Sequence, residues 1–101
     1  MFSSSDRELK DNLTVIKDSL DKIAGINGYE FDWNVKSEYE GHDIGVVAQE
    51  VEAVIPEVVR TNIRGYKTIR YEKIVPVLIE AIKELHKKIE HIEKNCECLN
   101  K

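Results

Sequence analysis

Hydrophobic residues recur at helical intervals near the N-terminus. Intervals of 4, 3, 4 and 3 residues predict one amphipathic helix from about Asp6 to Ala24. Its apolar positions are Leu9, Leu13, Ile16, Leu20 and Ile23. Ser5 followed three residues later by Glu8 fits a capping box at the start of this helix. Gly25 then fits its C-terminal end.

The spacing of hydrophobic residues changes in the central part of the chain. Residues 29–34 alternate aromatic and polar side chains, which predicts a half-buried strand with Tyr29, Phe31 and Trp33 in the core or an interface. Residues 43–47 form a second short strand candidate after a charged loop. Helical spacing resumes over residues 48–54 and ends before Pro56.

A β-hairpin is expected next, with strands at residues 58–59 and 66–71 and a turn at residues 62–65. This stretch is locally basic. Its cationic residues are Arg60, Arg64, Lys67, Arg70 and Lys73. We interpret it as a solvated hairpin, and a phosphate or nucleotide site over residues 60–73 is the minority alternative. No other cofactor is expected.

The C-terminal segment, residues 74–101, keeps a strict alternation of three- and four-residue intervals, as in a coiled coil. Val75, Ile82, Ile89 and Cys96 occupy heptad position a, and Leu78, Leu85, Ile92 and Leu99 occupy position d. The expected oligomer interface consists of Leu78, Ile82, Leu85, Ile89 and Ile92. Pro76 is tolerated because it lies in the first turn.

The length of the C-terminal helix indicates that it packs against helices of other chains. From residue 75 to residue 99 it is about 37 Å long at ~1.5 Å per residue. The remaining ~75 residues form a globule only about 25–30 Å across. Its distal apolar stripe therefore stays in water unless identical helices cover it, which predicts an oligomer. The number of chains stays open, because β-branched residues at a with Leu at d favour dimers and Ile92 at d favours higher states.

Together these elements predict a single α+β domain over residues 1–101, with an N-terminal helix, a small central β-region with a short helix, and a long C-terminal helix. Residues 1–4 are interpreted as the remnant of an upstream segment or an added start. Residues 5–73 are expected to form the globular part, and residues 74–101 the coiled-coil helix.

Composition narrows the function classes. The chain has 101 residues, of which 42% are hydrophobic, so it supports one domain with a real core. A net charge of −4 argues against a dedicated nucleic-acid binder. No apolar run is long enough to span a membrane, and the opening residues lack the features of a signal peptide. Cys96 and Cys98 are two residues apart and would point away from each other on a helix, so they are poorly placed to pair, which favours a reduced compartment. His86 and His91 do not have the spacing of a helical metal pair, and no metal is expected.

Ser5 and Lys10 are the candidate catalytic pair. A serine hydroxyl becomes a good nucleophile only when a base removes its proton. A lysine serves as that base where burial lowers its pKa from about 10.4 towards neutrality. Ser-Lys pairs are a known variant of the catalytic triad. The spacing alone is also that of an ordinary helix cap followed by a lysine.

Three separated blocks of the chain resemble the endosialidase-type intramolecular chaperone domain. They are SDRELKDNL at residues 5–13, IGVVAQEV at residues 44–51, and YEKI at residues 71–74 with LIEAIKEL at residues 78–85. The resemblance covers roughly residues 5–88 in the family's order. The family often has Arg two positions before the lysine, where this chain has Glu8 preceded by Arg7.

The resemblance implies a homotrimeric chaperone at the C-terminus of a phage tail spike, tail fibre or neck appendage. Such a domain helps the preceding segment of its own polypeptide to trimerise and fold in the bacterial host cytoplasm, and then cuts itself off. Carried over, the nucleophile is Ser5, the base is Lys10, and the scissile bond is Ser4–Ser5. No membrane or nucleic-acid partner is expected.

Several details stay open in the sequence. Direct hydrolysis and an N→O acyl shift are both consistent with a nucleophile that also carries the leaving amine. Asp6 either orients Lys10 or caps the helix, and the cap is favoured. His42 either supports the site or is an ordinary loop histidine. Gln49 and Glu50 belong to the central block and could cap a helix or bond between subunits. A non-catalytic trimerisation cap is the alternative function.

Overall fold

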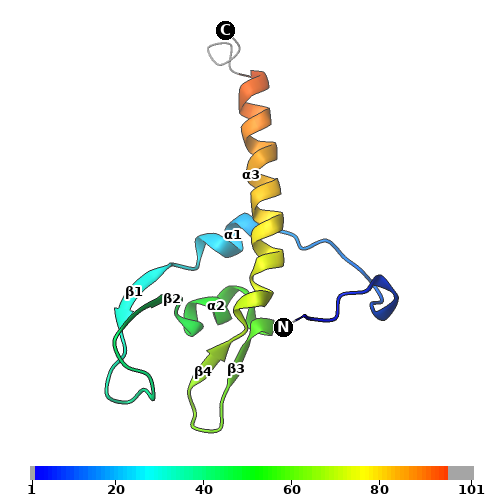
Figure 1. Cartoon of the computed structure of the whole chain (residues 1–101). Coiled ribbons are helices and arrows are strands. Elements are labelled where there is room, and N and C mark those ends of the chain that lie inside the picture. Colours follow the sequence, from blue (N-terminus) through cyan, green and yellow to red (C-terminus); the bar gives the residue numbers. More distant parts are fainter. Residues whose placement is uncertain (1, 96–101) are drawn as a thin grey trace.

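The computed structural model describes residues 2–95 and has an α+β fold (Figure 1). Its helices and strands are α1 (Ser19–Ala24), β1 (Tyr29–Asp32), β2 (His42–Gly45), α2 (Ala48–Val54), β3 (Val59–Thr61), β4 (Lys67–Ile69) and α3 (Val75–Asn95). Short 3-10 turns lie at Arg7–Leu9, Pro56–Val58 and Tyr71–Lys73. The predicted α+β class, the short central helix and the long C-terminal helix are confirmed.

The strands form two separate antiparallel hairpins. Strand β1 pairs with β2 so that Asp32 lies opposite His42, and β3 pairs with β4 so that Thr61 lies opposite Lys67. The β3–β4 turn is closed by Asn62, whose Oδ1 accepts hydrogen bonds from the backbone N–H groups of Arg64 and Tyr66. Both predicted β-regions are therefore present, each as a two-stranded hairpin.

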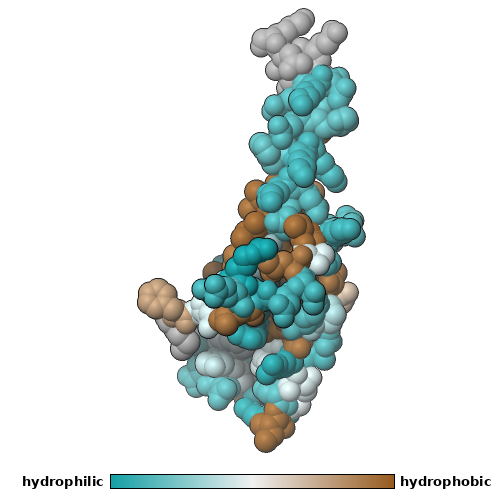
Figure 2. Space-filling model, turned by 90° about the vertical axis from the view of Figure 1, so that its right-hand side faces the viewer, coloured by the Kyte–Doolittle hydropathy of each residue, from teal (hydrophilic) through white to brown (hydrophobic). Residues whose placement is uncertain are grey.

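A small core joins α2 and the β3–β4 hairpin to the base of α3. Its buried side chains are Val51, Ile55, Val58, Ile74 and Val77. Helix α1 packs beside α3, where the Glu84 carboxylate accepts hydrogen bonds from the backbone N–H groups of Ser19 at 2.9 Å and Leu20 at 3.0 Å. Seen from the side of the N-terminal segment, hydrophobic side chains gather around the base of the stalk (Figure 2).

Helix α3 projects from this core as a stalk, and the molecule measures 57 × 38 × 25 Å. Its radius of gyration is 18.1 Å, against about 13 Å for a compact domain of this length. The described heptad side chains from Leu78 to Ile92 are exposed in the single chain; Ile82, for example, is 66% exposed. The heptad positions at Cys96 and Leu99 lie outside the described residues. No helix within residues 2–95 has the length and hydrophobicity to cross a membrane.

The predicted N-terminal helix over residues 6–24 is wrong for most of its length. Only the last six residues are α-helical, and the chain before them holds a single 3-10 turn. Asn12 and Asp18 adopt positive φ angles of 56° and 57°, which interrupt a helix. An amphipathic helix is stabilised mainly by packing of its apolar face, and Leu9 is 73% exposed in this chain.

Candidate functional site

The candidate site lies on the N-terminal arm, our name for residues 2–18. The 3-10 turn at Arg7–Leu9 reverses the chain, and the backbone N–H of Lys10 donates to the Arg7 carbonyl at 3.1 Å. This turn places the Lys10 Nζ 2.8 Å from the Ser5 Oγ, where it donates a hydrogen bond. Two residues five positions apart are thus held in direct contact by a local turn.

Asp6 fixes the turn that carries this pair. Its Oδ1 accepts a hydrogen bond from the backbone N–H of Glu8 at 2.9 Å, so Asp6 is the cap. The predicted capping box between Ser5 and Glu8 is therefore wrong. A carboxylate one residue further along takes the capping position, which leaves the Ser5 hydroxyl to Lys10.

Ser5 and Lys10 are both exposed in the single chain. A hydroxyl next to an amine is the arrangement needed for nucleophilic attack assisted by a general base. The amine acts as a base only in its neutral form, which burial favours. Ser5 and Lys10 therefore lie at the distance that a Ser-Lys dyad requires. In the single chain they are open to water, whereas a lysine base depends on burial.

His42 begins β2 and belongs to a cluster on the β1–β2 hairpin. Its Nδ1 lies 2.9 Å from Asp32 Oδ1 and its Nε2 lies 3.3 Å from Glu30 Oε1. The hydrogen bond to Asp32, followed by that to Glu30, raises the pKa of His42 above its ordinary value of 6.5. The structure thus joins His42 to the hairpin carboxylates, and no hydrogen bond within residues 2–95 joins it to the arm.

Glu50 clamps the start of β1 against α2. Its carboxylate accepts hydrogen bonds from the Tyr29 hydroxyl at 2.5 Å and from the backbone and side-chain nitrogens of Asn27, each at 3.1 Å. The Tyr29 bond, and then the Asn27 bonds, lower the pKa of the Glu50 carboxyl, while Glu50 raises the pKa of Tyr29. Glu50 therefore makes contacts within its own chain. Its neighbour Gln49 is exposed beside a groove.

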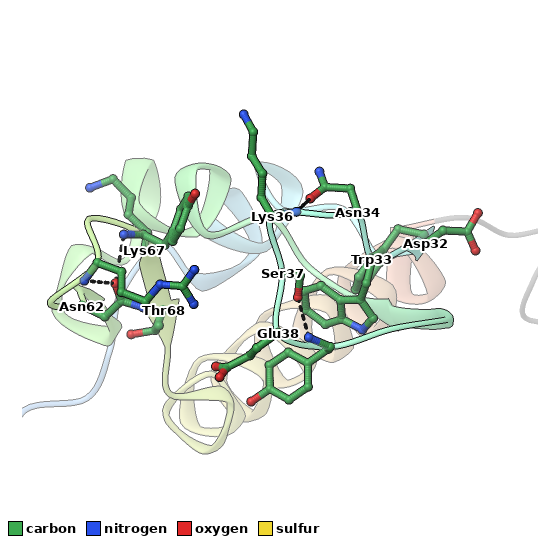
Figure 3. Close-up of a pocket in the computed structure, with 13 residues that line it drawn as sticks. Asp32, Trp33, Asn34, Lys36, Ser37, Glu38, Asn62, Lys67 and Thr68 are labelled. Atoms are coloured by element: carbon green, nitrogen blue, oxygen red, sulfur yellow. Dashed lines mark hydrogen bonds between the residues drawn. The ribbon is translucent and has the colours of Figure 1, made fainter.

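Two adjoining hollows lie between the hairpins. The first, of about 500 Å³, separates the loop after β1 from the β3–β4 turn (Figure 3). Asn34 and Ser37 brace this loop by accepting hydrogen bonds from the backbone N–H groups of Lys36 and Tyr39. The second, of about 810 Å³, we call the inter-hairpin groove. Its lining includes Ile44, Val46, Val47, Gln49, Tyr66 and Tyr71.

Tyr71 organises one wall of the inter-hairpin groove. Its hydroxyl accepts a hydrogen bond from the backbone N–H of Val46 at 3.2 Å. A Cβ at Gly45 would lie 2.6 Å from the same hydroxyl oxygen, so the glycine leaves room for the ring. The hydrophobic pattern of the sequence does not predict this role of Tyr71. The available signal was that Gly45 and Tyr71 each stand in one of the three resembling blocks.

Three of the five basic residues of the β3–β4 region have side-chain partners. Lys67 pairs with Glu52 and Arg70 with Glu72, each at 2.9 Å, and the Arg64 guanidinium lies 5.7 Å from the centre of the Tyr66 ring. Within residues 2–95 no group of three side chains suitable for a metal ion occurs.

Comparison with known proteins identifies the family. The family described as chaperone of endosialidase matches residues 5–60, which include the Ser5–Lys10 pair, the central block and the start of the β3–β4 hairpin. The chain therefore belongs to this family.

The chain is also similar to long tail fiber protein Gp37 of several phages. It is 33% identical over 102 residues to the proteins of Enterobacteria phages K3 and T2, covering 92% of this chain and 8% and 7% of those proteins. It is 31% identical over 100 residues to that of Salmonella phage S16, covering 90% of this chain and 13% of that protein. The chain thus spans a small fraction of the length of these relatives.

Proposed function

We propose that this chain is an intramolecular chaperone that brings together three copies of an upstream tail-fibre segment and then releases itself by cutting the Ser4–Ser5 bond. The hydrogen bond of 2.8 Å between Lys10 Nζ and Ser5 Oγ carries the proposal. It supports a nucleophile–base pair at the spacing expected from the family. We place this assembly step in the cytoplasm of the bacterial host.

The chemistry proceeds from Lys10 in its neutral form. Ser5 Oγ attacks the carbonyl carbon of Ser4 while its proton passes to Lys10 Nζ. The Ser4–Ser5 C–N bond breaks, and Lys10 returns the proton to the departing amine of Ser5. The acyl group is now an ester on Ser5 Oγ. Water then cleaves this ester, which yields a Ser4 carboxylate and a Ser5 with free amine and hydroxyl groups.

Trimerisation is supported by the exposed stripe on α3. The described residues Leu78, Ile82, Leu85, Ile89 and Ile92 lie on one face at alternating intervals of four and three residues, and each is exposed by at least 41%. Packing identical stripes against one another removes these side chains from water at about 25 cal/mol per Å². A three-stranded stalk would hold the chains in register at the end of the fibre.

The test uses a fusion of residues 1–101 behind an upstream fibre segment, examined on denaturing gels and by mass spectrometry. Cleavage is expected to leave Ser5 as the new N-terminus. Ser5→Ala and Lys10→Ala are both expected to stay intact, and Ser3→Ala and Lys17→Ala serve as matched controls that cut normally. Release of the domain by both dyad variants would refute the assignment.

A non-catalytic trimerisation cap is the second candidate. The observations in its favour are that Ser5 and Lys10 are exposed in the single chain and that the α3 stripe, which would mediate assembly without them, is exposed as well. The two functions separate in the same fusion. A wild-type chain that trimerises the fibre segment and keeps the Ser4–Ser5 bond after long incubation is a cap, and a chain that loses that bond is a self-cleaving chaperone.

A further inference from the structure

The single chain exposes far more surface than a compact protein of its size. Its accessible surface is 8933 Å², whereas a folded monomer of this mass exposes about 5,800 Å². The excess of about 3,000 Å² exceeds the ~800 Å² that each partner buries in one standard interface. It is large enough for every chain to contact two neighbours.

Three described surfaces contribute exposed hydrophobic side chains to this excess. The α3 stripe has helical spacing and fits other copies of α3. The arm exposes Leu9, Leu13 and Val15, and the inter-hairpin groove exposes Ile44, Val47 and Tyr71. With the stripe assigned to the stalk, the arm and the groove remain as one apolar segment and one apolar receptor per chain.

The arm and the groove do not meet within one chain. The arm loops out on one side of α3, whereas the β1–β2 hairpin that forms a wall of the groove lies on the other side (Figure 1). Every described residue of the arm from Phe2 to Val15 is exposed. A contact between the arm of one chain and the groove of the next is heterologous, and such contacts form a closed ring when the rotation between copies closes, as it would around a three-stranded stalk.

We propose that the N-terminal arm of one chain docks in the inter-hairpin groove of a second copy, and that this contact completes the Ser5–Lys10 site. The inference rests on the proposed self-cleavage and names its missing partner. Docking inserts Leu9 and Leu13 among Ile44, Val47 and Tyr71, and removes water from the Ser5–Lys10 pair. Exclusion of water favours the neutral amine that the reaction requires.

Polar groups in the groove suit this occupant. The Tyr71 hydroxyl accepts from Val46 N–H and keeps its own proton for a further acceptor, and Gln49 presents an exposed amide at the same wall. A backbone that crosses the groove in extended form offers the carbonyl groups that these donors need. Lys10 has extended φ and ψ angles of −130° and 130°, consistent with such a path.

The test combines two variants of the fusion in one trimer. The first has Ser5→Ala, with no nucleophile and an intact groove. The second has Ile44→Glu with Val47→Glu, an intact dyad and a charged groove. Each alone is expected to stay uncut. Assembled with an excess of the first, the second is expected to be cut in most of its chains, because its arms now meet intact grooves.

A matched arm variant gives the opposite result. Leu9→Glu with Leu13→Glu keeps the dyad and the groove but replaces the two apolar side chains of the arm that would enter a groove. An excess of Ser5→Ala chains should therefore not restore its cleavage. Rescue of both variants, or of neither, would overturn docking between chains. Normal cleavage by the groove variant alone would also overturn it. Sedimentation establishes that each variant still assembles.

A readout without cleavage separates this inference from the proposed function. Leu9 is replaced by the photoreactive p-benzoylphenylalanine in chains carrying Ser5→Ala, and isotopically light and heavy chains are mixed before irradiation. Crosslinks from position 9 to the groove that join light to heavy chains support the docking even if the wild-type fusion never cuts itself. Crosslinks within one chain, or to α3, refute it.

Discussion

The Tyr71 hydroxyl accepts a hydrogen bond from the backbone N–H of Val46 at 3.2 Å, directly over Gly45. This contact ties the end of the β3–β4 hairpin to the strand that leads into α2. Two segments that lie 25 residues apart in the sequence thereby form one wall of the inter-hairpin groove. The Tyr71 hydroxyl occupies the space that a side chain at position 45 would need, which the glycine leaves open.

A double-mutant cycle tests this relationship. Tyr71→Phe is expected to cost about 1 kcal/mol of unfolding free energy through the lost hydrogen bond. Gly45→Ala is expected to cost about 1–3 kcal/mol, because its Cβ meets the hydroxyl oxygen. Together they should cost less than both costs added, because removal of the hydroxyl also removes the clash. Urea unfolding measures each free energy, and strictly additive costs would contradict the proposed contact.

A charge in the α3 stripe should disrupt the oligomer. Ile89→Asp places a carboxylate in the proposed seam at a cost of about 3 kcal/mol per chain, which is more than a hundredfold in the association constant. Ile89 is 46% exposed in the single chain, so the fold of each chain should survive. Analytical ultracentrifugation should show monomers. The near-ultraviolet circular dichroism spectrum, which reports the fold of each chain, should be unchanged. Lys87→Asp, at the outer heptad position f, is the matched control and should stay oligomeric.

Glu84 should control the attachment of the arm through α1. The backbone N–H groups of Leu20 and Ser19 hold the pKa of Glu84 below its ordinary value of 4.5. This stabilisation is therefore present above about pH 4.5 and is lost as the pH falls through the lowered pKa. Glu84→Gln should remove that acid dependence and speed hydrogen exchange at Ser19 and Leu20. Glu93→Gln is the control, and equal exchange in both variants would contradict the capping role.

The β1–β2 hairpin should respond to pH through His42. Asp32 and then Glu30 raise the pKa of His42, so its ion pairs stabilise the hairpin below pH 6.5 and are lost as the pH rises through the raised pKa. Asp32→Asn should lower the pKa of His42 in an NMR titration, and Glu38→Gln should leave it unchanged. A His42 pKa that does not respond to Asp32→Asn would refute this arrangement.

The sequence by itself determined the elements that local pattern specifies. The alternation of aromatic and polar residues predicted β1, and the helical spacing before Pro56 predicted α2. The turn at Asn62–Gly65 predicted the second hairpin, and the heptad spacing predicted α3. Short-range periodicity decides these elements because each hydrophobic face follows from spacing alone. The resemblance of residues 5–13 to the family's first block led to the pairing of Ser5 with Lys10, which spacing alone left open, and the turn at Arg7–Leu9 brings the two side chains to 2.8 Å.

Only the tertiary structure decided what joins distant segments. Glu84 caps α1 from 65 residues away, Glu50 clamps Tyr29 across 21 residues, and Tyr71 reaches Val46 across 25. No periodicity reports such contacts, because they depend on how whole elements pack. The arm shows that a local pattern does not form its predicted element when tertiary packing is missing. Its spacing fits an amphipathic helix, but a helix forms stably where its apolar face has a surface to cover, and within one chain Leu9 and Leu13 stay exposed.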